Sequence, residues 1–156
     1  MAEFTYNPVQ RVQPNQPILL NTTIGCPKGY VIHREGSGLV TLRGITDNCF
    51  ARYQVTFNGN IAIPEDGDAP APISVAIAID GEPVLTSKAI VTPADVTPEG
   101  QTSENYFNVT STAIITVPKG CCYNISVENT SESVDPTIPA PVINVQNANL
   151  VISRIA

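Results

Sequence analysis

Apolar and polar side chains alternate with a period of two over most of the chain. In the segment 51–63, Tyr53, Val55 and Phe57 share one face and the residues between them are polar. The apolar positions are mainly β-branched or aromatic, which favours strand over helix. Three more segments repeat this pattern: 73–80, 106–117 and 123–129.

Shorter segments add strand candidates, and the last segment changes phase along its length. In 142–155, Ile143 and Val145 fall in one phase, whereas Leu150 and Ile152 fall in the other. Either a β-bulge lies near Gln146 and Asn147 or both faces are buried. The shorter candidates are 17–23, 29–33, 38–44 and 87–92. About nine strands and no convincing helix predict an antiparallel all-β sandwich.

The first 16 residues differ from the rest of the chain. They are rich in Pro and Gln and show little periodicity, so they predict an extended N-terminal arm at 1–16. The remaining 17–156 has the length of one domain. The apolar and aromatic residues of the arm include Phe4, Tyr6, Val9 and Val12.

Three long, Pro-rich connections carry most of the acidic residues. They cover 64–72, 93–104 and 131–141, and Asp80-Gly81 marks a tight hairpin elsewhere. Eight of the fourteen acidic residues lie in them and form a candidate loop-end surface: Glu65, Asp66, Asp68, Asp95, Glu99, Glu104, Glu132 and Asp135. Calcium binding is one interpretation, but no EF-hand spacing is present and solvated loops are favoured.

The direction of successive strands predicts where the four cysteines lie. Strands of a sandwich alternate in direction, so every second connection lies at the same end. The three acidic connections then share one end, and Cys26, Cys49, Cys121 and Cys122 share the other. Three interpretations stay open for the cysteines: a disulfide or mixed-thiol role, reduced and buried structural residues, or a zinc site, for which CxxC spacing is absent.

Charged residues are scarce, and the net charge of the chain is negative. Only 14% of the residues are charged, where about 25% is usual, which suggests that other protein covers part of the exterior. A net charge of −6 argues against nucleic acid or an anionic membrane as a partner. No segment approaches the roughly 20 apolar residues of a membrane span, and no secretory signal starts the chain. We therefore expect synthesis in a cytoplasm.

A series of short motifs resembles the jelly roll of the complement-globular-head and tumour-necrosis-factor superfamily. The motifs are Gly38-Leu39-Val40, Asp80-Gly81, Val117 to Gly120, Asn129 to Ser131 and the apolar last strand. The bacterial and phage branch is the most similar, including the C-terminal domains of collagen-like spore-surface proteins and phage capsid decoration or head-fibre proteins. A Gly-x-y stalk is absent, and aromatic residues make up only 6%.

The resemblance implies a homotrimer with a role in surface decoration, adhesion or receptor contact. A short arm in place of a stalk favours a phage virion component made in a bacterial host. Its partners would be copies of itself and a capsid or other virion protein bound through the arm. The candidate anchoring residues are then Phe4, Tyr6, Val9 and Val12. The alternative is a carbohydrate- or receptor-binding adhesin of a spore or cell surface, for which Tyr6, Tyr53 and Tyr106 could contact a host glycan.

Enzyme chemistry has little support in the sequence. His33 is the only histidine, and it lies at a strand end, where a structural or exposed role is expected. None of the common nucleophile, zinc-protease, phosphate-loop or dinucleotide motifs is present. We expect a non-enzymatic protein without a cofactor.

Overall fold

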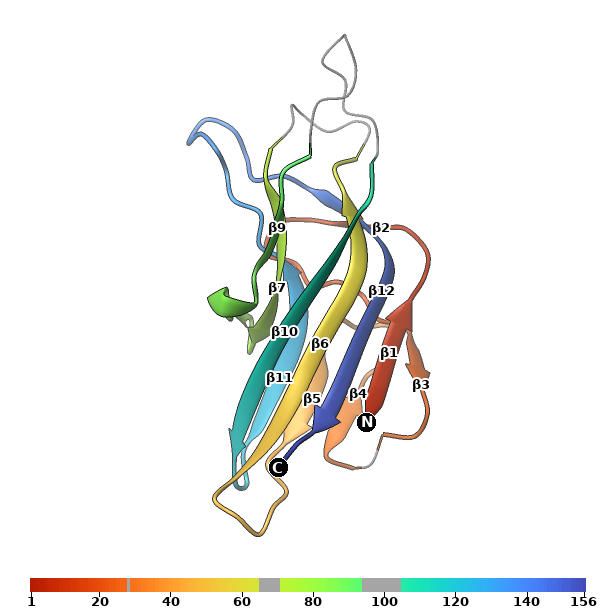
Figure 1. Cartoon of the computed structure of the whole chain (residues 1–156), viewed down its shortest axis with the longest axis vertical. Helices are drawn as coiled ribbons and strands as arrows, with labels where there is room; N and C mark the ends of the chain where they lie inside the picture. The colour runs from red at the N-terminus through yellow and green to blue at the C-terminus, as the bar shows by residue number, and fades with distance from the viewer. Residues whose placement is uncertain (28, 65–70, 94–104) are drawn as a thin grey trace.

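The computed structural model describes residues 1–27, 29–64, 71–93 and 105–156 and shows two antiparallel sheets packed on one core (Figure 1). Sheet A contains β1 (Ala2–Tyr6), β2 (Gln10–Val12), β3 (Thr22–Ile24), β6 (Phe50–Ala62), β10 (Phe107–Pro118) and β12 (Ile143–Arg154). Sheet B contains β4 (Val31–His33), β5 (Val40–Arg43), β7 (Ile73–Ile79), β8 (Glu82–Pro83), β9 (Ala89–Val91) and β11 (Cys122–Asn129).

The order of the strands is that of a jelly roll. Sheet A runs β10-β6-β12-β1-β3, with β2 beside β12, and sheet B runs β4-β5-β11-β7-β8, with β9 beside β7. From β5 to β12 the chain crosses between the two sheets at each long connection, as Greek-key connections require. The predicted all-β jelly-roll class is confirmed, and each of the nine predicted segments overlaps a strand, although 17–23 shares only Thr22 and Thr23 with β3.

Within the described residues, the one helical element is a short 3-10 turn, η1 (Leu85–Ser87), between β8 and β9. No helix in that part of the chain has the length and apolar character needed to cross a membrane.

The alternating residues of the long strands build the core between the sheets. Tyr53, Phe57 and Ile61 from β6 are fully buried, as are Ile73 and Ile77 from β7. The polar residues between those of β6 point to the outer face of sheet A. Burial of this apolar surface is the main source of stability for such a sandwich.

The phase change in the last strand is a β-bulge. The register of β12 against β6 shifts between Gln146 and Asn149, and Asn147 has a φ of 54°. Asn tolerates this left-handed conformation better than most residues. The bulge lets Val145 and Leu150 both face the core, so the first of the two predicted explanations is correct.

The N-terminal segment is part of the sandwich, which corrects the expectation of a separate arm at 1–16. Strand β1 lies between β12 and β3, with Phe4 opposite Leu150. Strand β2 pairs with the first residues of β12. The following chain pairs with β11, where the amide of Ile18 donates to the carbonyl of Val127 at 2.7 Å.

The four candidate anchoring residues therefore have different environments. Phe4 is fully buried and Val12 is 2% exposed, so neither is free to contact a particle. Tyr6 is half-buried, and Val9 is exposed. The physical reason is that two short strands supply apolar residues that the core needs, although Pro8 and Pro14 interrupt their pattern.

Candidate functional site

The structure places the connections that carry the four cysteines at one end of the sandwich, at the bottom of Figure 1. Cys49 lies between β5 and β6, and Cys121 and Cys122 lie at the β10–β11 turn. The amide of Lys119 donates to the carbonyl of Cys49 at 3.0 Å, and that of Gly44 donates to the carbonyl of Cys121 at 2.8 Å. These hydrogen bonds hold two of the connections side by side.

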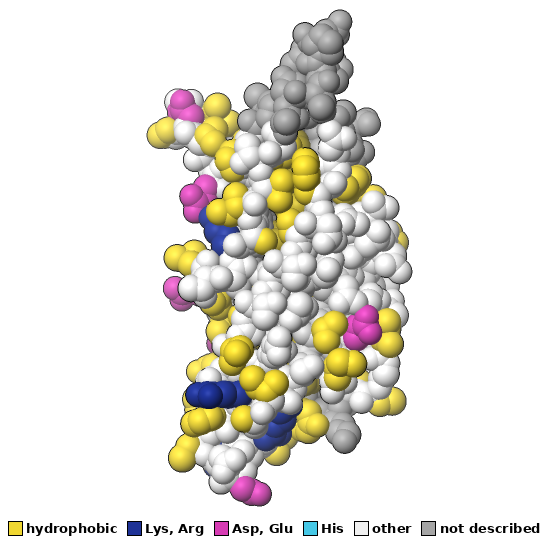
Figure 2. All heavy atoms as spheres, viewed as in Figure 1, with side chains coloured by type: hydrophobic (Ala, Val, Ile, Leu, Met, Phe, Trp, Pro, Cys, Tyr) yellow, Lys and Arg dark blue, Asp and Glu magenta, His cyan; other side chains and the backbone are white. Residues whose placement is uncertain are grey.

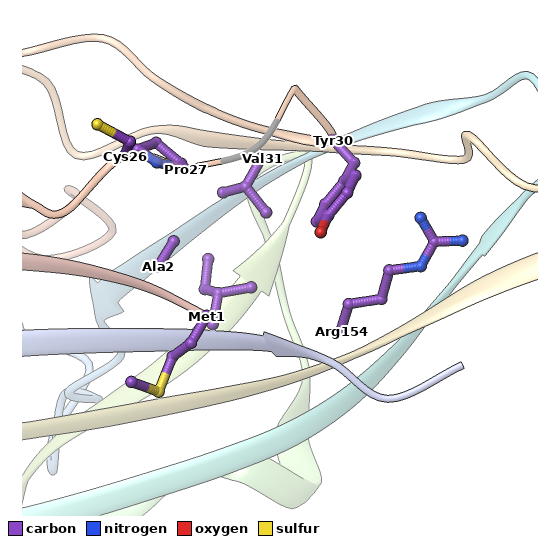
Figure 3. A pocket seen from close by; sticks show the side chains of 8 residues that line it. Met1, Ala2, Cys26, Pro27, Tyr30, Val31 and Arg154 are labelled. Carbon is purple, nitrogen blue, oxygen red and sulfur yellow. The ribbon is translucent and has the colours of Figure 1, made fainter.

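Cys26 reaches the same end through the β3–β4 connection. It lines a small hollow with Arg154 from the end of β12 (Figure 3). The hollow has a volume of about 110 Å³, well below the roughly 300 Å³ at which ligand pockets usually begin. Its lining residues are Met1, Ala2, Cys26, Pro27, Tyr30, Val31, Ile152 and Arg154.

All four thiols are free and exposed. This arrangement contradicts the interpretation of buried structural cysteines, and none of the four is joined to another within the chain. Within the described residues, no group of three or more His, Cys, Asp or Glu side chains could hold a metal ion. The disulfide or mixed-thiol role stays a prediction.

Four positive residues belong to the strand ends and the turn at the cysteine end. Arg43, at the end of β5, lies directly opposite Cys122 in the sheet register. Lys119 belongs to the β10–β11 turn, and Arg52 lies near the start of β6 with its guanidinium 4.9 Å from the Phe50 ring centroid. The Arg154 guanidinium lies 5.0 Å from the centroid of the Tyr30 ring. Acidic residues accompany them: Asp47 belongs to the β5–β6 connection, and the Asp80 carboxylate accepts a hydrogen bond from the amide of Asn124, two residues after Cys122, at 3.0 Å.

At the opposite end, the described strand ends gather as the alternation of strand direction predicts. Phe107 pairs with Ile61, Asn144 pairs with Ala62, and Ile73 pairs with Val91. Six acidic residues assigned to this end lie outside the described residues: Glu65, Asp66, Asp68, Asp95, Glu99 and Glu104.

The two remaining acidic residues of that set are exposed and already have partners. Glu132 accepts a hydrogen bond from Lys88 Nζ at 2.9 Å. The Asp135 carboxylate accepts hydrogen bonds from the Thr137 amide and hydroxyl, and these lower the pKa of Asp135. Such contacts are typical of solvated loops.

Two residues with candidate chemistry have structural roles. His33 Nδ1 lies 3.0 Å from Thr23 Oγ1, and its ring packs 4.7 Å from that of Phe4. Tyr53 is fully buried, and its hydroxyl donates to the carbonyl of Arg43 at 2.6 Å. Tyr53 therefore cannot stack on a glycan, and the prediction that it is one of three glycan-contacting tyrosines is wrong.

The outer face of sheet A is a broad polar surface with few charges. Figure 2 shows it largely uncharged over β6, β10 and β12. The charged strand residues on it are Glu3, Arg11 and Arg52. Thr and Asn side chains from β6 and β10 pair across its centre: Thr56 with Thr112, and Asn58 with Thr110 and Asn108.

A buried carboxylate on sheet B was not found by sequence reasoning. Glu128 is 6% exposed and accepts one hydrogen bond, from the Ser126 hydroxyl at 3.3 Å. Its neighbours across the sheet are Pro17 and Ala76. Burial raises the pKa of Glu128, and the hydrogen bond from Ser126 offsets part of that effect. The sequence did carry one sign that this face of sheet B is covered. On β7, the positions expected to be polar include the small apolar residues Ala76 and Ala78, and both are buried.

A Glu128→Gln variant is expected to be more stable than the wild type at pH 7. Because the folded-state pKa is raised, the folded protein favours the protonated carboxyl, and its stability falls as pH rises from about 4.5 through the folded-state pKa. The variant should lack this part of the pH dependence. Urea unfolding at several pH values measures it, with the exposed Glu35→Gln as the control. A loss of stability at pH 7 in the Glu128 variant would contradict the prediction.

The comparisons with known proteins give a structural likeness only. No protein-family model matches the chain, and no curated protein sequence matches it. Among solved structures, the chain is similar to the globular domain of zebrafish complement 1qA protein. The TM-score is 0.49 and the identity 12%, over 96% of this chain and 94% of that chain. We assign the jelly roll from the strand order of this chain.

Proposed function

We propose that this protein is a non-enzymatic, trimeric component of a phage virion surface, a capsid decoration or head-fibre protein that presents loops to the exterior. The observation that carries the trimer is the outer face of sheet A. Five adjacent strands form it, and their side chains are almost all uncharged. An exposed surface normally carries interspersed charge, which keeps a monomer soluble.

Apolar exposure along the edge of the same sheet supports contact between copies. Strand β10 is an edge strand of 12 residues, and its Ile114 is 64% exposed. Long unprotected edges promote association unless another element covers them. A threefold arrangement that packs sheet A against neighbouring copies would cover both the face and this edge.

The mass in solution tests the trimer. Wild-type protein in reductant is expected at about 50 kDa, three times the 16.6 kDa of one chain, by light scattering. Replacing Thr56 and Thr112 with Arg places like charges at the centre of the face and should yield single chains. Thr41→Arg, on the outer face of sheet B, is the matched control and should stay trimeric. A wild-type mass of one chain would contradict the trimer.

The location on a virion is tested separately. Antibodies raised against the protein are expected to label the surface of intact phage particles in electron microscopy. Labelling confined to spores or cell surfaces would overturn the virion proposal and favour an adhesin. A glycan array would then use Tyr6 and Tyr106, which are half-buried, as the candidate contact residues.

A further inference from the structure

We propose that the outer face of sheet B is a docking surface for an extended segment of a partner protein, and that Glu128 binds a lysine side chain of that segment. The inference rests on the proposed function in one respect. A trimer that buries the outer face of sheet A leaves the outer face of sheet B, which lies behind sheet A in Figure 1, free for a different protein.

The Glu128 side chain belongs to the outer face of sheet B. Ile125 and Val127 of β11 lie in the core, and side chains alternate along a strand, so Ser126 and Glu128 point the other way. Only 6% of Glu128 remains exposed. Such burial is unusual for a carboxylate on the outside of a sheet, because glutamate is almost never buried unless it is paired.

No cation pairs with Glu128 among the residues that the structure describes. Its one hydrogen bond there comes from the Ser126 hydroxyl to Oε1, and Oε2 accepts none. A carboxylate can accept about four hydrogen bonds, so most of its capacity is unused. Burial accordingly raises the pKa of Glu128.

The described strands on either side bring no charge to Glu128. The residues opposite it are Ala76 of β7 and Pro17 of the segment that pairs with β11. Beyond them, the hydroxyl groups of Ser74 and Thr130 bond to each other. Three charged residues of the neighbouring strands and turns have other partners: Lys88 binds Glu132, Asp80 accepts from the Asn124 amide, and Arg43 donates to the carbonyl of Gly29.

Exposed apolar side chains flank this carboxylate on two sides. Ile90 of β9 pairs with Ser74 and is 60% exposed. Leu39 directly precedes Val40, which pairs with Ile125, and is 46% exposed. Between them the outward residues are small and buried: Ser74, Ala76, Ala78 and Ser126. A segment lying across this surface can bury apolar side chains on Leu39 and Ile90 while one positive side chain reaches Glu128.

The unpaired carboxylate selects the chemistry of the partner. A positive side chain completes an ion pair, whereas a neutral one leaves the carboxylate buried without a partner and an acidic one is repelled. Lysine fits better than arginine. An ammonium is a compact charge, but a guanidinium binds a carboxylate through both oxygens, and Oε1 already accepts from Ser126.

Three blocked pentapeptides, Val-Thr-X-Thr-Val with lysine, norleucine or glutamate at X, test the site on the full chain. In an extended peptide both valines lie on the same side as the central residue. Amide chemical shifts of the isotope-labelled protein report binding and its location. The lysine peptide is expected to bind on the order of tenfold more tightly than the norleucine peptide, with shifts centred on β11 and β7. The glutamate peptide should bind more weakly still.

Binding should also change the titration of Glu128. A nearby ammonium stabilises the carboxylate, so saturating lysine peptide should lower the pKa of Glu128. By linkage, the lysine peptide should bind more tightly as the pH rises through that pKa. The norleucine peptide should show neither effect. Carbon NMR of the glutamate carboxyl groups measures the titration with and without each peptide.

Variants separate the charge of Glu128 from the shape of the surface. Glu128→Gln is expected to fold, because it should be more stable than the wild type, but its preference for lysine over norleucine should fall to near one. Glu35→Gln, at an exposed residue of the β4–β5 connection, is the matched control and should keep the preference. Ile90→Ser should weaken all three peptides alike.

Equal binding of the lysine and norleucine peptides, shifts centred away from β11 and β7, an unchanged preference in Glu128→Gln, or no binding at millimolar peptide would overturn the proposal. So would n-butylammonium binding as tightly as the lysine peptide, because the site would then serve small cations and not a protein segment. The light-scattering mass is a separate result. A mass of one chain overturns the trimer, whereas the peptide comparison still decides the role of Glu128.

Discussion

Replacing Phe4 with alanine is expected to destabilise the protein by about 3–5 kcal/mol. Phe4 is fully buried in β1, between Leu150 of β12 and Thr23 of β3, and packs against the His33 ring. Truncation removes the buried ring and leaves a cavity that rigid neighbouring strands cannot fill. Urea unfolding followed by circular dichroism measures the loss, at one fixed protein concentration because assembly contributes to apparent stability.

Val9→Ala is the control for this prediction. Val9 lies in the same N-terminal segment but is 49% exposed, so its truncation should change stability by less than about 0.5 kcal/mol. Equal, small effects of the two substitutions would show that the N-terminal segment is a dispensable arm. A large effect of Phe4→Ala alone would establish that β1 is a structural strand of sheet A.

The long strands could be predicted from the sequence because their alternation is strong. Strand β6 has 13 residues and β10 has 12, so each repeats the period several times. The change of phase in β12 could also be interpreted, because shifting the register by one residue would turn Leu150 and Ile152 away from the core. Where one face of a strand must be buried, the pattern of apolar residues along that strand determines its register against the neighbouring strands.

The N-terminal strands could not be predicted because they are short and their partners are distant in sequence. Strand β1 has five residues and β2 has three, and both pair with β12 at the other end of the chain. A short strand shows little periodicity, and only the three-dimensional position of β12 gives it a partner. Strand β8 was missed because its two residues are too few to show any alternation, although its partner β7 directly precedes it in the chain.

The position of the cysteine end was accessible to reasoning from strand direction, but the residues that lie opposite the cysteines were not. Alternating directions bring distant connections together whatever their sequence, so the position of the cysteines follows from the number of strands. The proximity of Arg43 to Cys122 depends instead on the register of β5 against β11. The burial of Glu128 likewise depends on what lies over sheet B, which an alternating pattern cannot reveal.

Gly44→Ala is expected to destabilise the protein by about 3 kcal/mol and to loosen the cysteine end. A Cβ atom at Gly44 would lie 2.0 Å from the carbonyl oxygen of Pro118, a backbone atom that cannot move without shifting the β10–β11 turn. That shift would break the hydrogen bonds from Gly44 to Cys121 and from Gly120 to Gly44, each worth about 1 kcal/mol.

Urea unfolding gives the size of the Gly44→Ala effect, and hydrogen exchange at the Gly44 and Gly120 amides locates it. Gly29→Ala is the matched control, because a Cβ atom there would meet nothing within 4 Å. Unchanged exchange at both amides in Gly44→Ala would mean that β5 and the β10–β11 turn are not held together as described.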